Sequence, residues 1–437
     1  MLLHRGESPM DFAESMALFA TPQSLPSPAA EKSLIYSAFM DTYLPKRIGP
    51  MDSHFSFLQH LITTPGLRSE VSDSLDALAM VQVGSIYKDQ NLLRQAVKAY
   101  SKSLGGLVRT MSRKGVVEDD YALATVTVLA TCEFYDEIAQ VGDGWVRHIE
   151  GSQQLLAARG PESIQSDLAL TLFSNMRHGA LSHALIARKA CFLGSPEWRA
   201  VAWRVPYVDM ATILYDSALQ VPGVLERTDQ LNSESPDYVA DIDAILRDAR
   251  RLDAEIREWM ADFKVRSKWL DPSESHLFWL TKIANFPTFT SLCSDKTIEE
   301  AYMFPSFMVA YLVLVCWDVQ HFLRSAVQDL HKARYKASNG WFPDAEDIVT
   351  EEELTTYVMD MARCFPYMCE PVSSSTGIIG LFLPLRTVAW HFMKQGNWTM
   401  LKWVGAVRDS VFNKGMSPPS VSGRPSTMEG IRQGLKM

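Results

Sequence analysis

The segment YALATVTVLATCEFYDEIAQVGDGWVRHIEGSQQLLAARGPES, residues 121–163, decides how this chain folds. It carries no charge from Tyr121 to Cys132, which is typical of a helix buried on most faces. Further on, Trp145, His148 and Ser152 recur at helical spacing. Gly160 fits the left-handed residue that ends a helix, and Pro161 prevents the helix from resuming. The segment therefore predicts two packed helices joined by a short connection.

Residues 124–130, ATVTVLA, could alternatively form a strand, because β-branched residues favour extended structure. A lone strand between helical segments would have no partner, so we expect a helix here.

Helical periodicity extends over most of the chain and predicts an all-α fold, a large multi-helix bundle or array of irregular helical hairpins. The clearest apolar stripes lie in 91–113 and 236–263. The second helix is expected to begin at Pro236 with Ser235 as N-cap, and to carry exposed Asp243–Arg247 and Asp253–Arg257 pairs. The expected helices are 33–44, 54–63, 70–88, 91–113, 119–138, 144–158, 164–193, 206–219, 236–263, 297–333, 351–369, 378–395 and 398–413.

Stretches rich in Pro, Gly and Ser divide the chain. Residues 1–32 are expected to be a flexible N-terminal segment and 414–437 a flexible tail. A linker at 221–235 separates a front half, 33–220, from a rear half, 236–413, within one helical domain of residues 33–413. A second loop is expected at 336–350.

Composition excludes several classes of protein. The net charge of −9 over 437 residues argues against DNA binding by phosphate contacts, which need clustered Lys and Arg. The six cysteines are scattered and predict buried free thiols in a reducing compartment. The uncharged stretch 301–317 reaches the lower limit of a membrane span, but Pro305 and Asp318 favour a buried core helix and no membrane partner.

No catalytic signature occurs in the sequence. Dinucleotide-binding and phosphate-binding glycine loops, zinc-protease, serine-hydrolase and EF-hand motifs are all missing. His178 and His183 are five residues apart, which places them on different helix faces. We therefore expect no enzyme, no cofactor and no metal site.

One polar constellation needs an explanation. Glu133 follows the uncharged helix and would be costly to bury unpaired. His148 and Arg159 are its candidate partners, and Gly151 would let a neighbouring backbone approach closely. The constellation is either an effector site or a buried polar clasp that fixes two helices, and we favour the clasp.

The order of these residues resembles the fungal-specific transcription factor domain, the regulatory region of fungal zinc binuclear cluster regulators. The resemblance is strongest in 91–200 and looser in 36–60 and 378–415. It rests on Tyr100, Leu104, Leu107, Cys132, Glu133, Phe134, Trp145, His148, Gly151, Leu155, Leu156, Arg159, Gly160, Pro161, Phe173, Arg177, Arg188, Lys189, Phe192, Leu193, Pro196, Glu197 and Trp198.

The resemblance implies a non-enzymatic transcription regulator in the nucleus, controlling a metabolic or secondary-metabolite gene cluster. It also implies the structural clasp of the motif, made of Glu133, Trp145, His148, Gly151, Arg159, Gly160, Pro161 and Trp198. The family binds DNA through a cysteine-rich cluster upstream of this domain, and the sequence contains no such cluster. Either the chain is a truncated gene product, or it regulates transcription without binding DNA itself. The expected partners are proteins, the transcription machinery or a full-length regulator, with a small-molecule effector left open. The alternatives are an α-helical adaptor that acts through a protein partner and, less favoured, a helical enzyme.

Overall fold

The computed structural model describes residues 28–46, 53–112, 115, 118–139, 143–204, 208–266, 277–338, 340–412 and 415–416. Over these residues the all-α prediction is confirmed. The predicted flexible segments, 1–32 and 414–437, lie mostly outside the described residues.

Local capping explains where several helices of the front half begin. The side chains of Asp89, Asp119 and Ser166 accept hydrogen bonds from backbone N–H groups in the first turns of α5, α6 and α8, respectively. The front-half helices are α2 (Pro28–Tyr43), α3 (Ser53–Thr63), α4 (Ser69–Tyr87), α5 (Gln90–Met111), α6 (Asp120–Cys132), α7 (Gly144–Arg159), the 3-10 turn η2 (Pro161–Ser163), α8 (Asp167–Ala187), η3 (Phe192–Gly194), α9 (Pro196–Ala202) and α10 (Met210–Ala218).

The rear half is also helical, apart from one small antiparallel hairpin. Its elements are α11 (Val221–Asp229), α12 (Tyr238–Arg266), β1 (Trp279–Lys282), η5 (Ile283–Asn285), α13 (Pro287–Leu292), β2 (Glu300–Met303), α14 (Phe307–Ala337), η6 (Ala345–Asp347), α15 (Glu351–Met368), α16 (Ser374–Gly380), α17 (Phe382–Gln395) and α18 (Trp398–Phe412). In the hairpin, Trp279 pairs with Met303 and Lys282 with Glu300.

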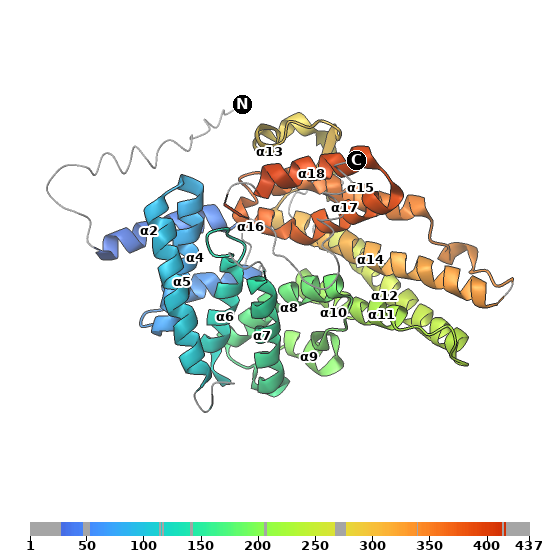
Figure 1. Cartoon of the computed structure of the whole chain (residues 1–437), viewed down its shortest axis with the longest axis horizontal. Coiled ribbons are helices and arrows are strands. Elements are labelled where there is room, and N and C mark those ends of the chain that lie inside the picture. Colours follow the sequence, from blue (N-terminus) through green and yellow to red (C-terminus); the bar gives the residue numbers. More distant parts are fainter. Residues whose placement is uncertain are drawn as a thin grey trace.

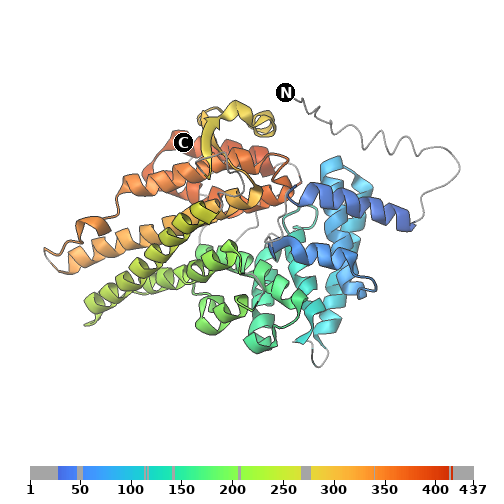
Figure 2. The same cartoon turned by 180° about the vertical axis from the view of Figure 1, so that it is seen from behind.

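The two halves lie side by side, with the blue and green front half opposite the yellow-to-red rear half (Figure 1). Both views show α12 and α14 running along each other, and they pack together (Figure 2). Helix α8 contacts α10 and α11, while α14 contacts α10, α11, α15, α16 and α17. The core is consequently continuous across the two halves.

The predicted linker at 221–235 is wrong in its first part. Residues Val221–Asp229 form α11, which buries Val221, Val224 and Leu225 against its neighbours. This i, i+3, i+4 spacing is a short amphipathic stripe, and Pro222 near its start is compatible with a first helical turn. The halves are therefore joined by packed structure.

Other predicted boundaries also shift. The expected helix at 297–333 begins only at Phe307, because Glu300–Met303 pair with β1 and Pro305 separates the two elements. The expected helix at 119–138 ends at Cys132, and α12 begins at Tyr238 rather than Pro236. The Ser235 hydroxyl accepts from the backbone N–H of Asp237, in the turn before that helix.

Helix α14 is the one helix among the described residues that is long and apolar enough to cross a membrane. Within its most apolar window, 94% of the helix is buried inside the protein. This extent of burial is typical of a core helix, in agreement with the prediction. All six cysteines are free and buried, also as predicted.

Candidate functional site

The polar constellation predicted around Glu133 has a third member, Tyr100 of α5. The Tyr100 hydroxyl donates a short hydrogen bond to Oε1 of Glu133. The Tyr100 oxygen also makes a hydrogen bond of 2.9 Å with Nε2 of His148. His148 Nε2 lies 3.8 Å from Oε1 of Glu133. We call Tyr100, Glu133 and His148 the Glu133 clasp; it joins α5, the end of α6 and α7.

The clasp is held by hydrogen bonds between groups that burial makes reluctant to ionise. Only 7% of Glu133 is exposed, and burial raises the pKa of its carboxyl group. Burial also lowers the pKa of His148 to about 4, so its imidazole is neutral at physiological pH. The geometric Glu133–His148 contact is therefore not a strong ion pair.

Arg159 does not take part in the clasp, contrary to one predicted pairing. Its Nη2 lies 2.5 Å from Oδ1 of Asp120 at the start of α6, and its Nη2 also donates to the backbone oxygen of Ser163 at 3.1 Å. Arg159 thus fixes the end of α7 to the start of α6, while Glu133 lies at the other end of α6.

The close approach expected at Gly151 occurs instead at Gly144. A Cβ built on Gly151 meets nothing within 4 Å, so the prediction for that residue is wrong. A Cβ on Gly144 would lie 2.1 Å from Oε2 of Glu133. Gly144 is the first residue of α7, and its missing side chain makes room for the carboxyl group.

The remaining predicted residues are structural neighbours of the clasp or lie apart from it. Trp145 is 4% exposed and meets Phe134 and Phe382 edge to face, so α7 contacts α17 of the rear half through it. Gly160 has φ +78°, a conformation that favours glycine, and Pro161 begins η2. Trp198 is buried elsewhere, stacked on Phe173.

A cavity of about 130 Å³ lies between the two halves, on the inner side of α7. Front-half helices α6, α7 and α8 and rear-half helices α14, α16 and α17 supply its walls. Trp145 and Ser152 of the predicted motif face it. Sequence reasoning missed the cavity because its two walls come from segments more than a hundred residues apart.

One carboxyl group lines this cavity. Asp318 of α14 is 1% exposed, and its Oδ1 accepts a hydrogen bond of 2.7 Å from the Thr387 hydroxyl of α17. Burial raises the pKa of Asp318 to about 7. A buried acid in an otherwise uncharged helix interior was the one sequence signal for this site.

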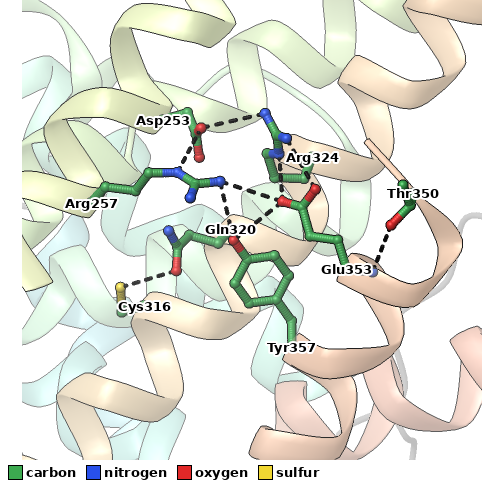
Figure 3. A network of polar contacts seen from close by, with 8 residues as sticks. All are labelled: Asp253, Arg257, Cys316, Gln320, Arg324, Thr350, Glu353 and Tyr357. Carbon is green, nitrogen blue, oxygen red and sulfur yellow. Dashed lines mark hydrogen bonds and ion pairs between the residues drawn. The ribbon is translucent and has the colours of Figure 1, made fainter. Parts of the chain in front are cut away.

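The rear half contains a second polar cluster, the Arg324 network, made of Asp253, Arg257, Arg324 and Glu353 (Figure 3). Arg324 donates to both carboxylate oxygens of Glu353, at 2.8 and 3.0 Å. Arg257 donates to Asp253 at 2.9 Å and to Glu353 at 3.3 Å. Of the two predicted pairs on α12, Asp253–Arg257 is confirmed, as part of a network that ties α12, α14 and α15. The other is wrong, because Asp243 pairs with Arg334 of α14 instead of Arg247. Two cations and two anions balance, which suits a structural role.

No group of three or more His, Cys, Asp or Glu side chains that could hold a metal ion occurs among the described residues.

Comparisons with known proteins give one relative. No family model matches the chain, and no solved structure matches it. A protein of Emericella nidulans, described as uncharacterized, is 27% identical over 201 residues. The match covers 43% of this chain and 43% of that protein, so the chain spans less than half of its relative's length.

Proposed function

We propose that this chain is a regulatory domain of the fungal-specific type, which controls transcription in the nucleus through protein partners without contacting DNA itself. Its targets would be the genes of a metabolic or secondary-metabolite pathway. It would perform no catalysis.

The observation that supports this proposal most is how the motif residues pack. Tyr100, Glu133 and His148 come from three helices and meet in one cluster, while Trp145 beside them reaches the rear half. The residues that carry the resemblance therefore include a clasp that organises the domain, rather than a reactive site.

The distribution of charge supports a role without direct DNA contact. In α12, whose arginines could be mistaken for a nuclear import signal, Arg250 pairs with Asp347 at 2.8 Å and Arg251 with Glu255 at 2.6 Å. These pairs neutralise two cations of α12, and the whole chain is acidic, with a net charge of −9. Phosphate binding needs unpaired cations in excess.

A tethering assay tests the proposal. The chain is fused to a heterologous DNA-binding domain in a fungal host, and expression of a reporter with the matching sites is measured. We expect reporter output to change at least about threefold relative to the DNA-binding domain alone. A folded, nuclear fusion that leaves the reporter unchanged would contradict the proposal. A nanomolar gel shift by the untethered chain would contradict the part concerning DNA.

An adaptor is the second candidate, and the outer face of α5 favours it. Leu104, Val108 and Met111 form a stripe there that is 37%, 60% and 47% exposed. Helix α5 contains no acidic residue. Exposed apolar stripes mark contact sites for other proteins. If the chain is an adaptor, Val108→Asp should abolish the tethered effect, while Val265→Asp at the 63% exposed end of α12 should not. Equal effects of the two variants would contradict a role for α5.

A further inference from the structure

The central cavity combines an aromatic wall with a single acidic group. Trp145, Phe382, Phe134, Phe307 and Tyr311 all line it, from both halves of the molecule. None of its lining residues is Lys or Arg, so Asp318 is the only side chain there that could carry a full charge, apart from an imidazole at His178. The His178 ring already bonds to the hydroxyl groups of Tyr215 and Tyr311.

The Asp318 carboxyl group lacks the partners that buried acids normally have. Its hydrogen bond from Thr387 engages one oxygen, Oδ1, and no ion pair reaches it in the described part of the chain. The buried carboxyl group of Asp216, in contrast, is paired with Arg177. A buried carboxylate without a cation is costly, and a cation supplied by a ligand would remove that cost.

We propose that the central cavity binds a small primary amine with a compact aromatic or aliphatic body, whose ammonium group pairs with Asp318. The aromatic wall suits such a ligand, since ring faces attract cations and ring edges pack against an apolar body. A cavity of roughly 150 Å³ holds benzene in another protein, so the volume of about 130 Å³ limits the body of the ligand to about the size of one ring. The proposal concerns binding and stands whether or not the chain regulates transcription.

A matched set of probes tests this directly. Benzylamine, benzyl alcohol and benzoate share one ring and differ in the charge of the attached group. Binding to the full chain is measured by calorimetry or ligand-detected NMR at pH 7. We expect benzylamine to bind at least about tenfold more tightly than benzyl alcohol, and benzoate not to bind, because the loss of a hydrogen bond to a charged group weakens affinity by about 10- to 100-fold. Equal affinities for the amine and the alcohol would overturn the proposal.

Two variants locate the site. Asp318→Asn should weaken benzylamine binding by about 10- to 100-fold and leave benzyl alcohol within about threefold. Ser182→Leu, which adds bulk to the cavity wall, should abolish binding of both probes. Asp209→Asn is the control, because Asp209 is a buried N-cap outside the cavity, and Asn is an equally good cap. Unchanged benzylamine binding in a folded Asp318→Asn or Ser182→Leu protein would overturn the proposal. If neither variant folds, the amine-over-alcohol preference of the unmodified chain decides it.

Discussion

The Glu133 clasp in the front half and the Arg324 network in the rear half join helices by opposite electrostatic means. In the clasp, burial disfavours the charged forms of both Glu133 and His148, and a phenol links them. In the network, two arginines pair directly with two carboxylates. The side chain of Glu353 is 25% exposed and that of Arg257 50% exposed, so water still solvates this cluster.

The difference follows from the number of charges and their access to solvent. Burial in an apolar surrounding raises the free energy of the charged form of an acid or a weak base. Arginine cannot lose its proton, so a partly buried arginine needs a carboxylate. We therefore expect the clasp to respond to pH and packing changes, and the network to loss of a single charge.

The largest effect on stability is expected for Trp145, which lies beside the clasp and lines the cavity. Trp145→Ala should destabilise the protein by about 3–5 kcal/mol, because it empties a buried site where the two halves meet. Urea unfolding followed by circular dichroism measures this. The 55% exposed Trp398 provides the control, Trp398→Ala, for which we expect less than about 1 kcal/mol. A Trp145→Ala protein as stable as the parent would show that the clasp region is not part of the core.

The stability that the Arg324 network provides should depend on Arg324 itself. Arg324→Met should cost about 2–4 kcal/mol, because Asp253 and Glu353 would lose their most buried cation. The same substitution at Arg266, whose exposed pair with Asp262 lies on the surface, should cost less than about 1 kcal/mol. Thermal unfolding of both variants compares them, and equal melting temperatures would show that the network is not stabilising.

Part of the acid sensitivity should come from the clasp, beside that of the buried His321 and His391, whose pKa values burial also lowers. The pKa of His148 is about 4 in the folded protein and about 6.5 in an unperturbed chain, so the unfolded state binds more protons between these values. The contribution of the neutral His148 to the free energy of unfolding is therefore complete above about pH 6.5 and is lost as the pH falls toward 4. His148→Gln should reduce the loss between pH 7 and 4.5 by roughly 1–3 kcal/mol, whereas His60→Gln at an exposed position should not.

Asp318 contributes to the pH dependence of stability with the opposite sign, because burial raises its pKa to about 7. It therefore destabilises the folded state increasingly as the pH rises from about 4 to 7. This contribution cancels when each variant is compared with the parent at the same pH. Parallel curves for the parent and His148→Gln would contradict the buried neutral imidazole.

Substitutions at two glycines of α7 test how this helix lies against the clasp. Gly144→Ala should destabilise by about 1–3 kcal/mol, because the new Cβ would overlap the Glu133 carboxyl group. Gly151→Ala should stabilise by up to about 1 kcal/mol, because a helical glycine with free space around it gains helix propensity. Chemical denaturation measures both. The opposite order of stabilities would show that α7 sits differently against Glu133.

The smallest effect is expected for Glu133→Gln. An amide oxygen can still accept the Tyr100 proton, so we expect a cost below about 1 kcal/mol, whereas Glu353→Gln should cost more because it removes a charge from the network. Unfolding curves at pH 7 compare the two. A larger cost at Glu133 would mean that its carboxyl group is ionised there.

Features that depend on neighbours along one helix could be predicted from the amino-acid sequence. Apolar stripes, the buried tryptophan of α7, the positive φ of Gly160 and the Asp253–Arg257 pair all follow from spacings of a few residues. These spacings fix which side chains share a helix face, whatever the rest of the chain does. The short α11 carries the same kind of signal, in a stretch whose composition predicts a linker.

The contacts between helix faces could not be predicted in this way and are known from the three-dimensional structure. Tyr100 completes the clasp from 33 residues before Glu133, Arg159 pairs with Asp120 rather than Glu133, and Arg324 joins a pair on another helix. Asp318 and Trp145 lie far apart in the sequence and line one cavity. Such meetings depend on helix crossing angles and on the packing of many side chains at once, which no single spacing along the chain specifies.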